Sequence, residues 1–280
     1  MHEIQILKYV DSWYSHLNKN QKLQAFFVIN GEAVNMGKAY MFDKLEQTNG
    51  GLTAKITAKD YVRQLNEQAY QGANETENLD DLISDILSGT GVTTKYKTGS
   101  IVPYTVVNKN TPKDTTKRAA IHYVCQDGDA TCTINRDGKL YITPFDVTNY
   151  VDTITLNELY SNDIIRMDDY VNMIRLTVKN EYVDPETQEV YFGGSGLYYR
   201  EIQNNCVYAS NGQMVANWLL EQYERRTYFE MKTRGNPAVE LGDTVRIIDK
   251  NGTAYLAVVY SQEFVYGKGG GLYCNLKAVM

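Results

Sequence analysis

The sequence predicts an α+β protein in which β-barrel-like domains flank a small inserted helical α+β domain. Alternating apolar and polar residues, interrupted by turn motifs, mark strands near the start of the chain and through its second half. Between these regions, apolar residues recur at the three- and four-residue spacing of helices. With 280 residues, 43% hydrophobic and 22% charged, the chain can bury a core without disulfides or metal ions.

The first sixty residues are expected to be mainly extended. Residues 23–30 read as a strand, and the segments 37–47 and 51–58 flank Asn49-Gly50-Gly51, which is a hairpin signal. Alternation along the second segment places Leu52, Ala54, Ile56 and Ala58 on one face and Thr53, Lys55 and Thr57 on the other. Residues 4–17 fit either a helix or a strand.

Three helices are expected in the middle of the chain. Their apolar spacing places them at residues 60–70, at 79–87, and from Thr111-Pro112 to about Gln126. The residues expected to cap them are Asp60, Asn78 and Thr111. A hairpin follows, with Asp137-Gly138 in its turn.

The second half of the chain is expected to be mainly β-structure. The candidate strands are 172–181, 190–202, 227–232, 244–249, 253–264 and 271–279. One helix, capped by Asn211, interrupts them with an apolar stripe formed by Met214, Val215, Trp218 and Leu219. Short strands at this spacing predict a barrel or a sandwich.

Composition and charge exclude several classes of protein. The chain carries 28 basic and 34 acidic residues, a net charge of −6, which argues against nucleic-acid binding as its main role. No apolar run reaches the length of a membrane span, and the N-terminus lacks the pattern of a signal peptide. We therefore expect synthesis in the cytoplasm, no membrane anchor and no specific nucleic-acid binding.

No residue pattern predicts catalysis or a cofactor. The four cysteines are too widely spaced for a zinc site, and we expect them to be packed thiols. His122 is expected to be structural, and the glycine runs at 193–196 and 267–271 to be flexible turns, because neither opens a helix. We predict no catalytic, cofactor-binding or metal-binding residues, and no enzymatic activity.

Paired carboxylates and short basic clusters receive a structural interpretation as well. We expect the acidic residues Asp80, Asp81, Asp127, Asp129, Asp168 and Asp169 to face solvent or to cap helices. We expect solvated faces at the basic residues Lys113, Lys117, Arg118, Arg225 and Arg226.

Several motifs resemble, in the correct order over residues 37–280, the baseplate hub proteins of phage tails. The corner RGNPAVELGDTVRI and the final strand FVYGKGGGLYCNLKAV resemble the C-terminal barrel of that family, at Gly235, Pro237, Gly242, Asp243, Gly270, Gly271 and Leu272. Upstream, Ala58 and Asp60 resemble its strand-to-helix step, residues 82–92 its second helix, and residues 116–142 its helix and DG hairpin. The chain is thus similar to contractile-tail or tailocin-type hubs and other tail-tip structural proteins.

The resemblance implies a structural protein of a virion or phage-tail-like particle. Such hubs form a homotrimer whose paired barrels make a pseudo-sixfold ring, which adapts the hexameric tail tube to the central spike. The implied partners are the tube or tube initiator, the spike or tip, the tape measure and other baseplate proteins. The implied domains are a first, shortened or partner-completed barrel at 1–60, an α+β insertion at 61–150 and a barrel with one helix at 151–280. A cell-wall hydrolase and a carbohydrate- or receptor-binding tail protein remain the alternatives.

Overall fold

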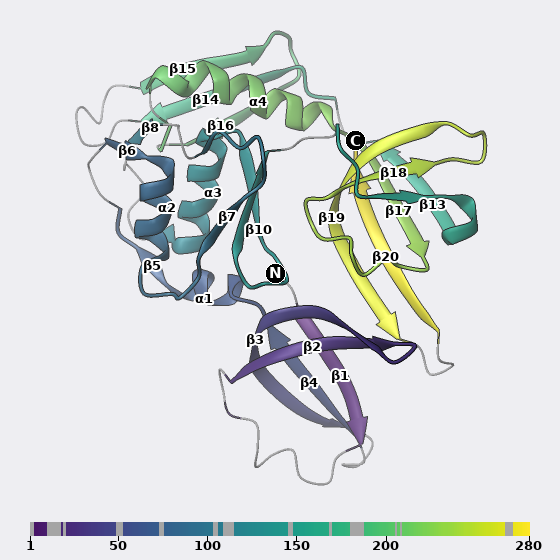
Figure 1. Ribbon diagram of the computed structural model, residues 1–280. Helices are drawn as coiled ribbons and strands as arrows, with labels where there is room; N and C mark the ends of the chain where they lie inside the picture. Colours follow the sequence, from purple (N-terminus) through teal and green to yellow (C-terminus); the bar gives the residue numbers. More distant parts are fainter. Residues whose placement is uncertain are drawn as a thin grey trace.

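The chain builds several separate sheets; in Figure 1 the helices lie to the left, the C-terminal sheet to the right and the N-terminal sheet below them. The computed structural model describes residues 3–9, 18, 21–48, 53–72, 76–102, 106–108, 115–144, 148–167, 170–179, 188–204, 206–207, 209–266 and 271–280. Within these ranges, no helix has the length and apolar character needed to cross a bilayer.

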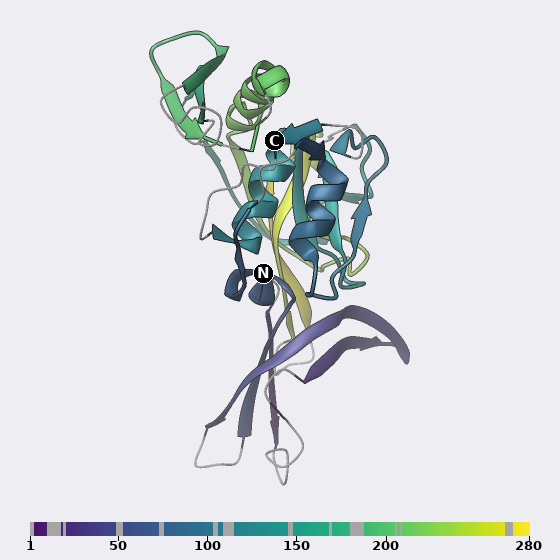
Figure 2. The same cartoon turned by 90° about the vertical axis from the view of Figure 1, so that its left-hand side faces the viewer.

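The N-terminal sheet projects away from the rest of the molecule (Figure 2). Its strands are β1 (Glu3–Tyr9), β2 (Lys22–Ile29), β3 (Glu32–Thr48) and β4 (Thr53–Lys59), in the antiparallel order β1-β4-β3-β2. Asn30 and Gly31 have φ of 52° and 86°, values that suit the tight turn between β2 and β3. Of the two alternatives for residues 4–17, the strand is right for residues 4–9. Residues 10–17 lie outside the described part, and so do residues 49–52 between β3 and β4.

Strand β4 is buried on both faces over part of its length. Ile56 and Ala58 are buried as expected, but Thr57, on the opposite face of β4, is buried as well. Both faces of β4 are therefore covered at this point.

The middle of the chain has its own apolar core. Its helices are α1 (Val62–Glu67), α2 (Leu79–Leu87) and α3 (Lys117–Asp127), and its strands are β5 (Ala69–Tyr70), β6 (Thr76–Asn78), β7 (Thr94–Tyr96), β8 (Val106–Asn108), β9 (Thr115–Thr116), β10 (Ala130–Ile134) and β11 (Leu140–Pro144). The five apolar residues of α2 are all buried, and they pack with α3 and the β10–β11 hairpin. The predicted bounds of α2 and the predicted hairpin are confirmed.

Two helix ends differ from the expectation for one shared reason. Strands β5 and β9 pair, Ala69 with Thr116 and Tyr70 with Thr115. This pairing holds both segments extended, so α1 ends at Glu67 instead of at residue 70, and α3 begins at Lys117 instead of at Thr111. Residues 111–114 themselves lie outside the described part.

The caps of these helices are also partly different. Asp60 Oδ1 accepts from the Val62 N–H at 3.0 Å as expected, whereas Asn78 makes no side-chain cap bond. Thr116 caps α3, because its Oγ1 accepts from the Ala119 N–H at 3.2 Å.

Replacing Thr116 with alanine should lower the free energy of unfolding by about 1 kcal/mol, because the Ala119 N–H then loses its partner. Urea unfolding followed by circular dichroism measures the change. Thr116→Ser, which keeps the hydroxyl, should lose less than half as much; equal losses in both variants would contradict the cap.

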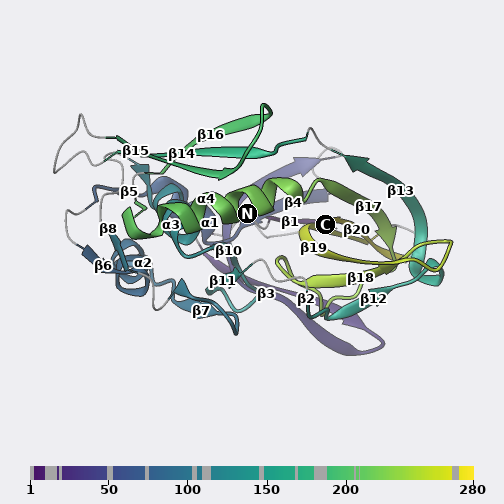
Figure 3. The same cartoon turned by 90° about the horizontal axis from the view of Figure 1, so that it is seen from above.

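A small sheet with a helix on one face follows (Figure 3). Strands β14 (Met173–Lys179), β15 (Gln188–Gly194) and β16 (Tyr199–Gln203) form it in the order β15-β14-β16, and α4 (Gly212–Glu224) packs on it. The single strand expected over 190–202 is wrong: Gly194 and Gly196 have positive φ and divide it into β15 and β16. This unit has its own core and lies outside the barrel-like sheet.

The C-terminal sheet curls toward closure. Its strands are β12 (Asp152–Ile154), β13 (Leu159–Met167), β17 (Thr227–Thr233), β18 (Thr244–Ile248), β19 (Ala254–Tyr266) and β20 (Leu272–Val279), in the order β12-β18-β19-β20-β17-β13. The edge strands β12 and β13 are joined only by residues 155–158, so the two edges must approach each other at that end. The sheet is barrel-like, as expected, and Figure 3 shows its curl.

Candidate functional site

The corner of the C-terminal sheet is held by a chain of hydrogen bonds. Asn236 Oδ1 accepts from the Ala238 N–H at 2.9 Å, and Asp243 Oδ2 accepts from the Glu240 N–H at 2.8 Å. Gly242 has a φ of 87°, which only glycine adopts without strain. Asn236 Nδ2 also donates to Asp152 Oδ2 at 3.0 Å, which ties the corner to the edge strand β12. The expected turn at residues 242–243 is confirmed.

The β10–β11 hairpin docks on this corner. Arg136 Nη2 donates to the Val239 carbonyl oxygen at 2.8 Å, and the Arg136 N–H donates to Glu240 Oε2 at 3.3 Å. Tyr40 of β3 lies near the same charges, and burial first, then Asp60, raises its pKa to about 12. The corner at residues 235–243 and the hairpin with the Asp137-Gly138 turn both belong to the motifs that carry the hub resemblance. These two segments therefore contact each other although they lie about a hundred residues apart in the sequence.

Two of the basic residues expected on solvated faces also make contacts within the chain. Lys117 Nζ donates to the Ser88 carbonyl oxygen at 2.6 Å, and a cation at this C-terminal end of α2 also suits the helix dipole. The Arg226 guanidinium lies 4.9 Å from the centre of the Tyr170 ring. Arg118 is exposed as expected, and Lys113 lies outside the described residues.

The cysteines are packed thiols, and His122 lies at the surface. No cysteine is in a disulfide; Cys125, Cys206 and Cys274 are buried, and Cys132 is half-buried. Burial raises the pKa of Cys206 and raises that of Cys274 to about 11, so both remain protonated thiols at neutral pH. His122 lies on the exposed side of α3, with Nε2 3.2 Å from Gln126 Nε2.

The acidic residues do not all behave as expected. Asp81 is exposed in the first turn of α2, and the neighbouring Asp80 accepts a hydrogen bond from the Tyr96 hydroxyl. Asp127, expected at the surface, is buried and accepts from Asn211 Nδ2 at 3.3 and 3.4 Å. Asp168 and Asp169 lie outside the described residues.

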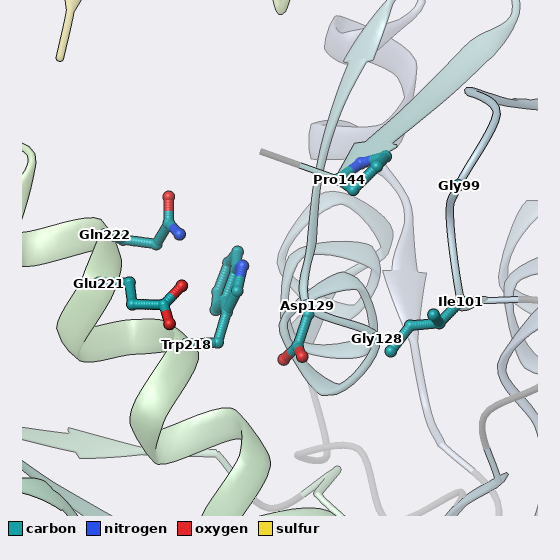
Figure 4. Close-up of a pocket in the computed structure, with 8 residues that line it drawn as sticks. All are labelled: Gly99, Ile101, Gly128, Asp129, Pro144, Trp218, Glu221 and Gln222. Carbon is teal, nitrogen blue, oxygen red and sulfur yellow. The ribbon is translucent and has the colours of Figure 1, made fainter. Parts of the chain in front are cut away.

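Asp129 lines a pocket that the sequence does not reveal. The pocket measures about 220 Å³ and lies between α4 and the segments around α3; Gly99, Ile101, Gly128, Asp129, Pro144, Trp218, Glu221 and Gln222 line it. In Figure 4 the Trp218 ring lies between the carboxylates of Glu221 and Asp129. The two acids are 92 positions apart, so only the packing of α4 could bring them together. Neither is a member of a described group of three or more His, Cys, Asp or Glu residues able to hold a metal ion.

The ionised form of the Asp129 carboxyl group is unfavourable at this position. Asp129 Oδ1 is buried and receives no hydrogen bond from any described residue. Burial, and second the charge of Glu221, raise the pKa of Asp129 to about 6. The folded protein therefore binds this proton more tightly than the unfolded chain does, and the free energy of unfolding should fall as pH rises from about 4 to above 6.

Replacing Asp129 with asparagine should stabilise the protein by about 1–2 kcal/mol at pH 7.5 and change little at pH 4, where the aspartate is already protonated in the fold. Thermal unfolding of both proteins across this pH range measures the difference. A constant difference at every pH would show that Asp129 does not carry the buried charge.

A further surface lies on the N-terminal sheet. Along β2, Phe26 and Val28 are 51% and 70% exposed, whereas Phe27 points inward and packs edge-on against Phe264 of β19 at 5.6 Å between ring centres. Strands β1 and β2 form the two edges of their sheet, and no described strand pairs with the outer side of either. Exposed apolar side chains beside open strand edges are typical of a surface that another chain covers.

The chain combines a four-stranded N-terminal sheet and a curled C-terminal sheet, joined by helical and mixed layers. Among solved structures it is similar to a tail protein from Neisseria meningitidis MC58, with a TM-score of 0.73, 12% identity, and coverage of 99% of this chain and 87% of that one. It is also similar to the 43 kDa tail protein of prophage MuSo2 from Shewanella oneidensis, with a TM-score of 0.68, 13% identity, and coverage of 99% and 88%.

A third similar structure comes from a secretion machine. An Escherichia coli component of the type VI secretion system, described as structurally similar to phage T4 tail proteins gp27 and gp5, matches with a TM-score of 0.51, 10% identity, and coverage of 99% and 68%. No family model matches the sequence, and no curated protein matches it. The fold is therefore that of phage tail proteins, as the sequence motifs predicted.

Proposed function

We propose that this chain is a structural hub protein of a phage tail or a phage-tail-like injection particle. Three copies would form a ring that adapts the hexameric tail tube to the central spike. The observation that carries the proposal is the fold shared along 99% of the chain with tail proteins. An assembly role also suits a surface with exposed apolar residues and few reactive groups.

The two barrel-like sheets suit the change from sixfold to threefold symmetry. The four-stranded N-terminal sheet and the six-stranded C-terminal sheet would each supply one barrel, so three copies supply six. We assign the first barrel to residues 1–60, the α+β insertion to 61–150 and the second barrel to the curled sheet within 151–280, from which the separate unit of β14–β16 and α4 projects. The open edges β1 and β2 suit pairing with a neighbouring copy, which would complete the smaller sheet.

The partners follow from this place in the particle. They are two further copies of the chain, the tube or its initiator, the spike or tip, the tape measure and surrounding baseplate proteins. The net charge of −6 suits a ring through which a polyanion passes without adhering. Synthesis in the cytoplasm of the bacterial host and incorporation into the tail baseplate complete the proposal.

The location can be tested on whole particles. Gold-labelled antibody against this chain should bind at the tail end that carries the spike, after mild detachment of the outer baseplate. Label along the tail sheath or on the head would contradict the proposal. Pre-immune antibody on the same particle preparation supplies the control.

A second candidate function, receptor or carbohydrate binding, is favoured by one aromatic surface. On β15, β16 and the segment between them, Phe192, Leu197, Tyr198 and Tyr199 are all exposed, and Tyr170 packs edge-on against Tyr198 at 6.2 Å. Aromatic rings of this kind also bind sugars. Glycan-array binding that is lost in Tyr198→Ala would favour this function, whereas an empty array supports the structural role alone.

A cell-wall hydrolase is less well supported. The pair Asp129 and Glu221 includes a carboxyl group with a raised pKa, as a general acid requires. The pocket of about 220 Å³, however, is below the 300–1,000 Å³ usual for ligand sites. Clearing of purified peptidoglycan that is lost in Asp129→Asn would favour hydrolysis and overturn the non-enzymatic proposal.

A further inference from the structure

The pocket beside α4 has the composition of a site for a positively charged group. Its walls carry two carboxylates, from Asp129 and Glu221, together with the indole ring of Trp218. No lysine or arginine lines it. A carboxylate pair without a compensating cation is unfavourable in a half-buried place, and the buried Asp129 Oδ1 receives no hydrogen bond from the described chain.

Each wall of the pocket suits one property of an organic cation. The carboxylates of Asp129 and Glu221 come from different elements, lie on either side of the Trp218 ring in Figure 4, and attract a positive charge into the pocket. An indole face attracts ammonium and guanidinium groups through its quadrupole, and tryptophan is the best such ring. Ile101 and Pro144 supply apolar surface for an aliphatic stem. A volume of about 220 Å³ suits one side chain rather than a larger ligand.

We propose that this pocket binds a guanidinium or alkylammonium group, presented by an arginine or lysine side chain of a neighbouring protein or by a free polyamine. The cation stacks against a face of Trp218 and is stabilised by the negative charges of Asp129 and Glu221. Arginine fits best, because its planar group can stack on the ring and pair with a carboxylate at the same time. This site is independent of the proposed trimer, because it involves neither β1 nor β2.

The probes are capped amino acids and a polyamine. The sequence has two tryptophans, so a spectrum of the ¹⁵N-labelled indole groups shows two signals, and the variant Trp13→Phe assigns that of Trp218. N-acetyl-arginine methylamide should shift the Trp218 signal saturably at millimolar concentration. The citrulline analogue, a neutral isostere, should bind at least fivefold more weakly. Equal responses to the two compounds would overturn the proposal.

Variants at the surface keep the test independent of folding. Glu221→Gln changes an exposed side chain and should weaken arginine binding at least fivefold. Glu224→Gln removes the same charge from α4 outside the pocket and should change binding less than twofold. Equal weakening by both would mean that only the general negative charge matters, which would contradict a specific site.

Spermidine identifies the source of the cation. Binding at least tenfold tighter than that of the capped arginine assigns the pocket to polyamines, and comparable binding assigns it to a side chain of a partner. No binding by either compound overturns the proposal. None of these results depends on the trimeric ring, so they distinguish this site from the proposed function.

Discussion

Replacing Phe26 and Val28 with glutamate should prevent incorporation of the chain into tails, with particle yield reduced at least a hundredfold, while the isolated chain still folds. Both side chains are exposed on the outer face of β2, so two carboxylates there cost the single chain little. In the assembled ring they would be buried against a neighbour, and unpaired buried charges cost several kcal/mol each. Complementation of a deletion strain by the variant, scored as the number of assembled tails counted by electron microscopy, measures the effect.

A matched variant distinguishes assembly from general surface damage. Tyr198→Glu with Tyr199→Glu introduces the same two charges on an equally exposed aromatic surface of the small sheet. It should leave particle yield within about threefold of the wild type. If the β2 variant assembles normally, or if both pairs fail equally, β2 is not the surface between copies.

Replacing Gly193 with alanine should destabilise the chain by about 3 kcal/mol or more. A Cβ atom at this position would lie 2.1 Å from the Ala216 carbonyl oxygen and 2.6 Å from its carbon, so α4 would have to move away from β15. The contact is with backbone, which cannot rotate aside as a side chain can. Denaturant unfolding measures the loss, and the helix packing should be the first part to open.

Gly271 supplies the control for this substitution. An added Cβ there meets no atom within 4 Å, and its φ is not in the left-handed region. Gly271→Ala should therefore change the free energy of unfolding by less than about 0.5 kcal/mol. If Gly193→Ala were equally neutral, the close contact between α4 and β15 would be wrong.

Gly193 also shows what the sequence could not reveal. In the sequence, Gly193 belongs to a glycine run that favours a flexible turn. Only the packing of α4 against β15 shows that this position leaves no room for a side chain. By contrast, α2 and the β10–β11 hairpin are predicted closely, because helical periodicity and an Asp-Gly turn are local signals. Elements whose ends depend on distant partners, such as α3, are predicted less well.

The same distinction explains the candidate sites. The corner at residues 235–243 can be predicted from the sequence, because its glycines, proline and aspartate determine the conformation of the backbone around them. Its contact with Arg136 depends on two segments about a hundred residues apart, and the pocket depends on α4 meeting the end of α3. Alternation and spacing carry no information on contacts between distant segments. From the sequence alone, Asp127 and Asp129 are therefore expected to face solvent or to cap helices.

The most direct test of the central claim is electron microscopy of the tail end, with density averaged without imposed symmetry. If this chain is a hub, three copies should surround a central hole, with the curled C-terminal sheets and the β1–β4 sheets alternating around it as six barrel-like lobes. A single copy per particle, a sixfold stack of copies along the tail, or density for this chain only at the particle's periphery would contradict it.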